Sequence, residues 1–367
     1  RLCRDWSSDV CSSDLAKIIP GSDFSNGSIA FFITGKYADA VPFYRMAKML
    51  ERSGLSVSRQ TLSNLAIGAA RAIGDLTEAM NGDVLASPVI LMDETTVQVL
   101  KHGEGPPGKS YMWAMRGFSG DKPIVRFAWN ASRSGSFADT LLKGYRGFLQ
   151  TDGYAGYDHL DGRDGIEHVG CFAHIRRKFV EAWETAGKTG RAKDAIDTIA
   201  KLYAVESTLR ERMNAGKLAA AEFVGTREYR ALPIISEFRS WLDARLLDTA
   251  PQSALGKAAS YAAKVLPRAE RYLKHELMTP DTNAIENAIR PFVIGRKNWL
   301  FSGSQLGAHS SAALYSLIET AKANGHEPYA YLSHLFEYLP RCGSLSEKHA
   351  LLPYRLDPKS YAAANGV

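Results

Sequence analysis

The chain has few cysteines and no long apolar run. Only four of its 367 residues are cysteine, and two of them, Cys3 and Cys11, lie in an opening segment that we regard as foreign to the protein. The other two, Cys171 and Cys342, do not suggest a disulfide framework. A reducing compartment, the cytoplasm, is the simpler inference. The apolar stretch IAFFIT is far shorter than the roughly 20 residues of a membrane span. We therefore expect neither a secreted disulfide-rich domain nor a membrane protein.

The first fifteen residues, RLCRDWSSDVCSSDL, match the translation of a common short-read sequencing adapter. One frame of that adapter gives the run from Asp5 to Leu15. We treat residues 1–15 as an adapter-derived, non-native segment and exclude them from fold reasoning. On this interpretation the natural N-terminus is missing and the protein is N-terminally truncated. The rest of the chain is long enough for two or three domains.

The sequence has no internal repeat and no low-complexity tract, and its charge is mildly basic. The formal net charge is +6. This balance suits a polyanionic partner such as DNA without requiring one, because many soluble proteins are mildly basic.

Residues 16–85 are predicted to form a helical region. Helical patterning runs up to Arg52, a turn follows at Ser53 and Gly54, and a second helix is expected to be capped near Ser58. Two helices joined by a short glycine turn are compatible with a DNA-binding helix-turn-helix. An ordinary helical hairpin explains the pattern equally well.

Residues 86–180 change to an α/β pattern. The stretch SPVILMDETTVQVL holds an apolar run ending in Asp93, as in a central strand buried on both faces. Two further strands follow around the turn at Gly120 and Asp121, and then a helix, a short strand ending at Asp152, another strand and a helix. This order predicts a mixed α/β sheet.

The remaining three ranges are predicted to be mainly helical. Residues 181–276 lose all strand character, and Ile199, Leu202, Glu206 and Leu209 share one largely apolar helical line. We predict an all-helical insertion here. Residues 277–325 would form the second part of the core, and residues 326–367 a C-terminal helix and tail.

Three acidic residues stand out by position. Asp93 and Asp152 are expected at strand ends, and Glu286 on a helix after the insertion, with gaps of 59 and 134 residues between them. Buried carboxylates are costly, and clustered ones raise one another's pKa. A divalent cation relieves both effects, and two Mg²⁺ ions about 4 Å apart can support phosphoryl transfer. The alternative is that the three acids are unrelated, with Glu286 in a surface ion pair with Arg290.

Five sequence blocks resemble successive signatures of the insertion-sequence 66 family of bacterial DDE transposases. They run in the family's order from about residue 29 to 340 and are ILMDETTVQVL, LQTDGYAGY, HVGCFAHIRRKF, NAIENAIRPFVIGRKNWLFSGS and YSLIETAKANGHEPYAYLSHLFEYLP. The resemblance implies a ribonuclease-H-like mixed sheet with flanking helices, interrupted by a helical insertion. It also implies that Asp93, Asp152 and Glu286 are the catalytic residues and hold Mg²⁺ or Mn²⁺, as two ions.

The chain departs from the family pattern in two places. The N-terminal leucine-zipper-like segment and the cysteine-rich putative zinc finger of the family are missing, consistent with truncation at the adapter. Thr282 and Asn283 stand where the family usually has paired asparagines. The hydroxyl of Thr282 keeps hydrogen-bonding capacity, so we expect little damage.

Basic residues in two clusters are expected to contact DNA phosphates. Pro291 disfavours helical geometry at the residue before it, so the helix should kink or end there and direct the following basic residues toward DNA. The alternative for the first cluster is a solvated basic face. The expected DNA-binding residues are Arg176, Arg177, Lys178, Arg290, Arg296 and Lys297.

Four other residues carry weaker signals. Cys171 and His174 form a C-x2-H pair, but zinc normally needs four ligands and no second pair follows, so we interpret the pair as structural or DNA-proximal. Trp299 could stack on a flipped base or belong to the core. His309 is expected at the surface or in packing, because a two-metal mechanism needs no histidine base.

The function indicated is that of a bacterial transposase. It would bind the terminal repeats of its element, hydrolyse a phosphodiester to free a 3′-hydroxyl, and join that hydroxyl to target DNA, as a homo-oligomer at the nucleoid. One alternative is a non-catalytic DNA-binding remnant or regulator of transposon ends. Another is a ribonuclease-H-like nuclease with a different substrate.

Overall fold

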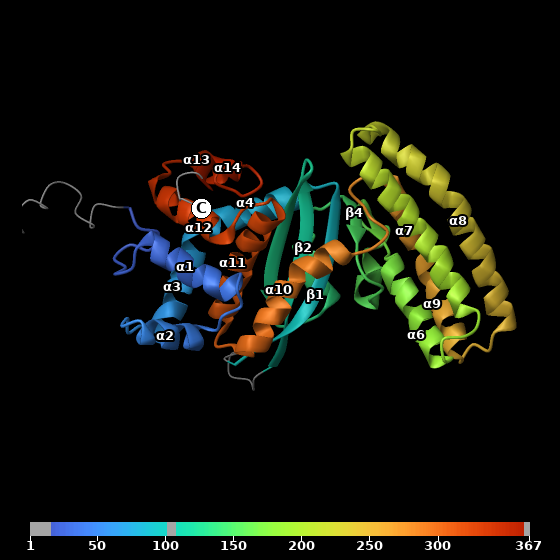
Figure 1. Ribbon diagram of the computed structural model, residues 1–367, viewed down its shortest axis with the longest axis horizontal. Helices are drawn as coiled ribbons and strands as arrows, with labels where there is room; N and C mark the ends of the chain where they lie inside the picture. The colour runs from blue at the N-terminus through green and yellow to red at the C-terminus, as the bar shows by residue number, and fades with distance from the viewer. Residues whose placement is uncertain (1–15, 101–107, 363–367) are drawn as a thin grey trace, which may run out of the picture. The chain divides into compact units, whose positions relative to one another are not determined.

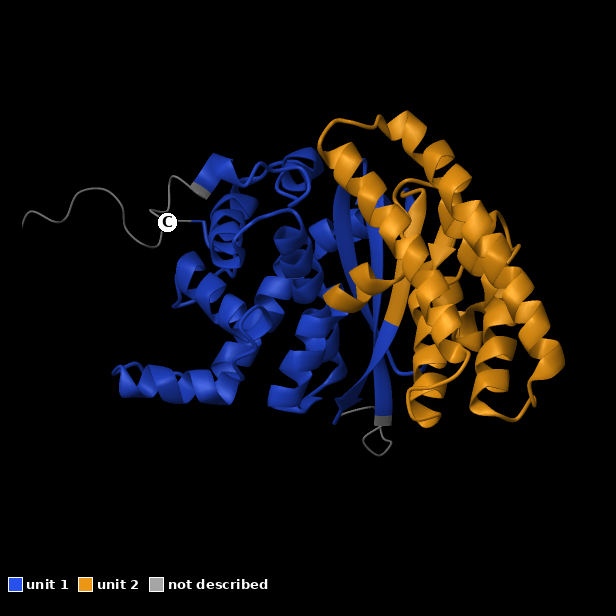
Figure 2. Cartoon of the chain, turned by 45° about the vertical axis from the view of Figure 1, so that its right-hand side comes forward, with its two compact units in different colours: residues 1–86, 94–133, 288–367 blue, residues 87–93, 134–287 orange. Residues whose placement is uncertain are grey.

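A computed structural model describes residues 16–100 and 108–362. The adapter-like residues 1–15 lie outside the described residues, as does the end of the predicted tail. The chain divides into two compact units (Figure 2). Unit 1 comprises residues 1–86, 94–133 and 288–367, and unit 2 comprises residues 87–93 and 134–287.

The described residues form a mixed open sheet, as predicted (Figure 1). Its order is β3-β2-β1-β4-β5, and β6 pairs with β1. β2 and β3 are antiparallel, whereas β4 pairs in parallel with both β1 and β5. The strands are β1 (Val89–Val99), β2 (Gly108–Ser119), β3 (Lys122–Asn130), β4 (Gly147–Gln150), β5 (Ile166–Val169) and β6 (Phe301–Ser302).

Unit 1 combines β2, β3 and β6 with helices from both ends of the chain. Ser58 caps α3 as expected, because its hydroxyl accepts the backbone N–H of Thr61 at 3.0 Å. The single helix expected before Arg52 is two helices, with Pro42 at the N-cap of the second. The helices are α1 (Asn26–Tyr37), α2 (Phe43–Arg52), α3 (Arg59–Ala72), α4 (Gly74–Leu85), α11 (Gln305–Ala323), α12 (Pro328–Tyr338), η3 (Leu339–Arg341), α13 (Leu345–Ala350) and α14 (Lys359–Ala362).

Helix α11 protects the exposed backbone of the edge strand β3. The hydroxyl of Thr320 accepts the N–H of Val125 at 2.9 Å, and the hydroxyl of Ser316 accepts the N–H of Phe127 at 2.8 Å. Unpaired edge strands invite pairing with other chains. These two side chains therefore satisfy donors that β3 would otherwise present to solvent.

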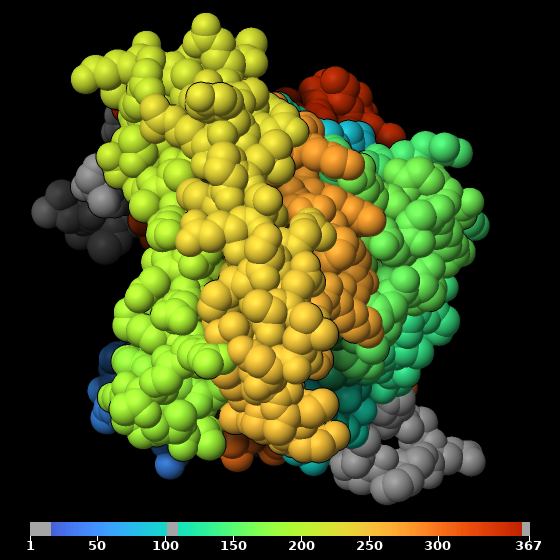
Figure 3. All heavy atoms as spheres, turned by 90° about the vertical axis from the view of Figure 1, so that its right-hand side faces the viewer, coloured from blue at the N-terminus to red at the C-terminus, as the bar shows by residue number. Residues whose placement is uncertain are grey.

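Unit 2 combines the start of β1 with β4, β5 and a group of helices. α6 packs against α7 and α9, and α8 lies between α7 and α9 on the outer face (Figure 3). The stretch predicted to lack strands is helical, and its line from Ile199 to Leu209 is buried. The helices are α5 (Gly135–Leu141), η1 (Ala155–Leu160), α6 (Phe172–Thr185), α7 (Ala192–Asn214), α8 (Ala220–Asp248), α9 (Ala254–Ala269) and η2 (Glu270–Lys274).

Helix α10 (Asn283–Trp299) begins in unit 2 and continues into unit 1. Its apolar face is buried as predicted, with Ile285 and Phe292 at most 2% exposed. A kink or an end was expected at Pro291, and the helix does not end there. A proline inside a helix removes one hydrogen bond, and here burial of the next residue, Phe292, offsets that loss. None of the described helices has the length and apolar character needed to cross a membrane.

Candidate active site

Asp93 lies on β1, and Asp152 lies just past the end of the neighbouring strand β4. β1 and β4 pair in parallel, with Val89 opposite Phe148 and Leu91 opposite Gln150, an offset of 59 residues. The same offset separates Asp93 from Asp152, so the register continued by two residues places them opposite each other. Paired strands lie about 4.8 Å apart, and residues two apart share a face. The parallel pairing therefore brings the chain at Asp152 to the part of β1 that carries Asp93.

The strand positions of these two acids differ from the expectation. Asp93 does not end its strand, because β1 continues to Val99. Beyond Met92 the strand is less buried: residues 93–96 are half-buried in succession, and only Val97 and Val99 are fully buried. Asp152 lies two residues past the end of β4. Its Oδ1 accepts the N–H of Tyr154 at 2.9 Å in a turn.

Gly153, which follows Asp152, lies close to a tyrosine of α9. A Cβ at Gly153 would meet the hydroxyl oxygen of Tyr261, so a larger residue there would displace that side chain. Burial, reinforced by the charge of Asp152, raises the pKa of Tyr261 to about 12. The tyrosine hydroxyl therefore stays neutral and packs against the backbone that presents Asp152.

Glu286 meets His174 at the start of α10. Its Oε1 lies 4.0 Å from His174 Nε2, and it accepts the hydroxyl of Thr282 at 3.2 Å. Burial lowers the pKa of His174, an effect that Arg177 strengthens and the charges of Asp152 and Glu286 oppose. The histidine thus lies within the electrostatic reach of both acids. The Nδ1 of His174 is buried and has no hydrogen-bond partner among the described residues.

The carboxylates suit a hard divalent cation by their chemistry. Within the described part of the chain, no three side chains of His, Cys, Asp or Glu stand close enough together to hold a metal ion. Carboxylate oxygens are nevertheless the donors that Mg²⁺ and Mn²⁺ prefer. Mutual repulsion between carboxylates without a cation favours such a spread arrangement.

Cys171 takes part in packing beside this site. It is buried and forms no disulfide. Its sulfur accepts the hydroxyl of Thr282 at 3.4 Å, and burial raises the pKa of its thiol. Thr282 therefore lies between Cys171, the residue before α6, and Glu286.

Asp281 is an acidic residue of the site that the sequence did not indicate. It is buried and accepts the backbone N–H of Asn283 at 3.0 Å and its side-chain amide at 2.8 Å. Burial raises its pKa, the charge of Glu286 adds to that effect, and a hydrogen bond with Tyr203 opposes it. A sequence signal existed, because Asp-Thr-Asn before an amphipathic run is typical of a helix start.

Arg176 and Arg177 lie beside the helix that carries Glu286. Both are exposed on α6 and line a hollow of about 480 Å³. Its other lining residues are Ala173, Val180, Ala200, Tyr203 and Asn283. Asn283 is the first residue of α10, so the hollow reaches the turn that bears Glu286. Lys178 instead pairs with Glu181 at 2.9 Å.

The second basic cluster lies in unit 1. Arg296 donates to the hydroxyls of Thr95 and Thr96, each at 3.0 Å. Together with Lys297 it lines a hollow of about 460 Å³. Arg290 is exposed. The expected DNA contacts of all three remain predictions.

Two aromatic residues have defined surroundings in unit 1. The amine of Lys36 lies 4.2 Å from the ring centroid of Trp299, which is half-buried. His309 is exposed and packs edge-to-face on Trp129 at 5.0 Å between ring centroids. These contacts agree with packing roles for both.

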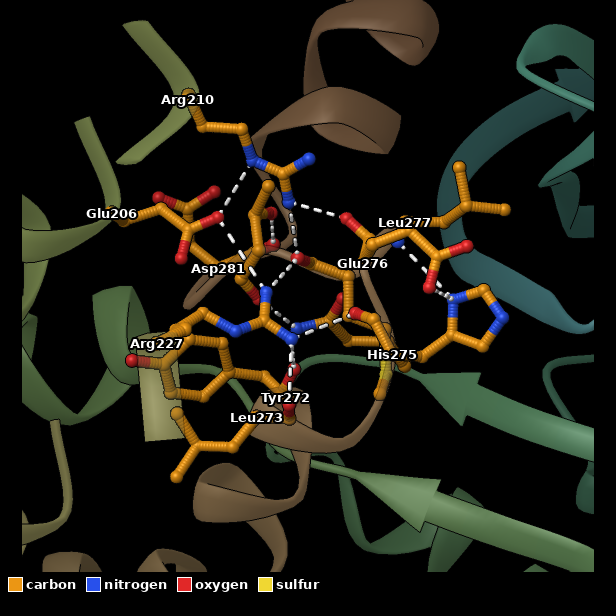
Figure 4. A network of polar contacts seen from close by, with 12 residues as sticks. Glu206, Arg210, Arg227, Tyr272, Leu273, His275, Glu276, Leu277 and Asp281 are labelled. Atoms are coloured by element: carbon orange, nitrogen blue, oxygen red, sulfur yellow. Dashed lines mark hydrogen bonds and ion pairs between the residues drawn. The ribbon is translucent and has the colours of Figure 1, made fainter. Parts of the chain in front are cut away.

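The sequence-based predictions also missed a buried charge network in unit 2. Arg227 is fully buried, and together with Arg210 it contacts the segment that leads to α10, while Glu206 pairs with both arginines (Figure 4). A signal was present, because Arg227 falls on the apolar line of α8 between Phe223 and Ala231. A lone arginine in such a line indicates a buried, paired guanidinium.

The fold and the site together define an α/β protein. Acidic residues lie on β1 and just past the parallel strand β4, and two arginines, Arg176 and Arg177, line a hollow that reaches the start of α10. Two family descriptions match this chain: "Transposase IS66 family" over residues 21–310 and "IS66 C-terminal element" over residues 316–354. The chain belongs to the IS66 transposase family, which confirms the resemblance.

Two proteins of Sinorhizobium fredii are similar over most of the chain. "Uncharacterized protein y4qI" is 30% identical over 342 residues, which cover 90% of this chain and 62% of the relative. "Uncharacterized protein y4jD" is 27% identical over 351 residues, covering 92% of this chain and 67% of the relative. The chain thus spans about two thirds of the length of these relatives.

Proposed function

We propose that this chain carries the catalytic centre of a transposase that cuts DNA and joins the cut end to a target. The observation that carries the proposal is that β1 and β4 pair in parallel, with Asp93 on β1 and Asp152 just past the end of β4. Glu286 joins them through its contact with His174. Family membership indicates the reaction class, DNA transposition, and we assign its catalytic centre to these acidic residues.

We assign the ribonuclease-H-like core of the family to the mixed sheet. In this assignment the helical stretch between β5 and α10 is the insertion. Open α/β sheets bind ligands at the carboxyl ends of their parallel strands, and Asp152 lies there on β4. The assignment thus explains why an acidic residue stands at that point.

Asp93, Asp152 and Glu286 would hold two divalent cations, Mg²⁺ or Mn²⁺. Such ions, when bound, neutralise phosphate charge and make water or a 3′-hydroxyl a better nucleophile at neutral pH. The protein's own groups position the acids. The hydroxyl of Thr282 orients Glu286, and the turn at Asp152 fixes that carboxylate.

Arg176 and Arg177 would hold the DNA backbone beside these acids. Both line the hollow that reaches Asn283. An arginine guanidinium forms paired hydrogen bonds with phosphate oxygens. The hollow has apolar walls beneath this basic rim, so it suits a nucleotide with its phosphate at the rim.

The test is DNA cleavage and strand transfer by a full-length version, with Mg²⁺ and DNA that carries the element's ends. Asp93→Asn, Asp152→Asn and Glu286→Gln should each lower both activities by orders of magnitude while DNA binding persists. Glu184→Gln, a change of an exposed acid on α6, is the matched control and should cut like wild type. Binding without any cutting by wild type would favour a non-catalytic DNA-binding remnant.

A further inference from the structure

The segment between η2 and α10 is held by a buried guanidinium. Arg227 of α8 is 0% exposed. It donates to the backbone carbonyls of Tyr272 at 2.7 Å, Leu273 at 2.8 Å, His275 at 2.9 Å and Met278 at 3.0 Å (Figure 4). One side chain of the helical region therefore fixes four points of the chain that leads to Glu286.

A second arginine, Arg210, also binds the backbone of this segment. Arg210 of α7 donates to the carbonyls of Glu276 at 2.5 Å and Met278 at 2.8 Å. Glu206 pairs with both arginines and offsets one of the two positive charges, because its Oε1 lies 2.8 Å from Arg210 Nε and 3.6 Å from Arg227 Nη1. α7 and α8 together thus contribute a compact charged cluster directed at the backbone.

The next two carbonyls are held by elements of the acidic site. Gln150 of β4 donates to the carbonyl of Thr279 at 2.8 Å, and the N–H of Phe172 donates to the carbonyl of Pro280 at 2.8 Å. Gln150 stands two residues before Asp152, and Phe172 two residues before His174. The carbonyls up to Met278 are consequently bound by α7 and α8, and those of Thr279 and Pro280 by residues close to Asp152 and His174.

Ordinary helix capping explains only part of these contacts. The carbonyls of Tyr272 and Leu273 belong to η2 and would need donors at any helix end. Those of His275, Glu276 and Met278 lie beyond η2, in a short turn where the carbonyl of His275 also accepts the backbone N–H of Met278 at 3.1 Å. Two arginines reach across from α7 and α8 to satisfy them, which restricts the path of the connection.

We propose that Arg210 and Arg227 are positioning residues that set where Glu286 stands relative to His174 and Asp152. The proposal rests on the proposed function, in which Glu286 holds a metal ion. Arg210 and Arg227 would then influence the acidic site without themselves touching DNA or metal.

The test compares Arg210→Met and Arg210→Lys with wild type, and uses Arg239→Met as control. The side chain of Arg210 is 26% exposed, so its replacement should leave the fold intact, unlike that of Arg227. Arg239 lies on α8 and pairs through an exposed contact with the side chain of Glu270. One readout is amide hydrogen exchange over residues 275–287. The other is thermal stabilisation by Mg²⁺ or Mn²⁺ alone.

Arg210→Met should speed exchange over residues 275–287 and raise the half-maximal cation concentration by about tenfold, the usual effect of losing a group that orients a metal ligand. Arg210→Lys should fall between Arg210→Met and wild type, and Arg239→Met should match wild type. Wild-type exchange and wild-type cation response in Arg210→Met would overturn the proposal. So would equal changes in Arg210→Met and Arg239→Met.

A failure of the proposed function gives a different result. In that case Mg²⁺ and Mn²⁺ would not stabilise wild type at all, and hydrogen exchange alone would decide the positioning role. Faster exchange over residues 283–287 in Arg210→Met, but not in Arg239→Met, would support it. Unchanged exchange would overturn it.

Discussion

Replacing Arg227 by methionine should strongly destabilise the protein. Methionine keeps much of the side-chain volume but removes the donors to the carbonyls of Tyr272, Leu273 and His275. Glu206, 6% exposed, would keep only Arg210 as its cationic partner. Removing one member of a buried ion pair typically costs about 3–5 kcal/mol. That is a large share of the roughly 5–15 kcal/mol by which domains are stable.

Urea unfolding followed by circular dichroism measures this loss as a shift in midpoint at constant slope. Arg239→Met, which breaks an exposed pair, should cost about 1 kcal/mol or less. Glu206→Gln should destabilise wild type and should cost less in the Arg227→Met background, because the ion pair between Glu206 and Arg227 is then already absent. An Arg227→Met protein within about 1 kcal/mol of wild type would refute the reasoning, since a buried charge pair cannot be broken so cheaply.

Three further outcomes follow from the structure. Burial lowers the pKa of Lys36 from 10.5 to about 8, so the folded state disfavours the cation. The stability of wild type relative to Lys36→Met should therefore rise as the pH increases from 8 to 10.5. A difference in urea midpoint that stays constant over this pH range would contradict this. Neutralising Arg176 and Arg177 together should reduce the slope of log affinity for DNA against log salt by roughly 1 to 2, whereas Arg239→Gln should leave it unchanged. Mg²⁺ or Mn²⁺ should raise the melting temperature of wild type by mass action, and Glu286→Gln should lose most of that gain in a thermal shift assay.

Much of the fold could be predicted from local pattern. The apolar run before Asp93 required a buried strand, and the turn at Gly120 lies between paired strands, with Ser119 opposite Lys122. The apolar line through Ile199 and Leu209 correctly indicated a buried helical face. Such patterns are local consequences of burial, which is why one sequence suffices to find them.

The exact ends of the elements depended on tertiary contacts. β1 continues past Asp93 because β6 pairs with its far end, at Gln98 and Val99. α10 continues past Pro291 while Phe292 packs against Tyr315 at 5.3 Å between ring centroids. Neither partner is a neighbour in sequence, so neither effect is visible in the local pattern.

The surroundings of the acidic site were equally hidden. The sequence singled out Glu286 by its position and by family resemblance, but it gave no indication that His174 lies beside it. Arg227 reaches carbonyls at least 45 residues further along the chain. Pairings over such separations are set by how the helices pack.

The most direct test of the central claim replaces Asp152 by cysteine in a full-length version and measures DNA cleavage with each cation. The account states that Asp152 holds a divalent metal. A thiolate is a poor ligand for the hard ion Mg²⁺ and a better one for the softer Mn²⁺. Asp152→Cys should therefore be inactive with Mg²⁺ and regain cleavage with Mn²⁺. Asp152→Asn should likewise be inactive with Mg²⁺. Full activity of Asp152→Cys with Mg²⁺ would contradict the account, because Asp152 would then hold no metal.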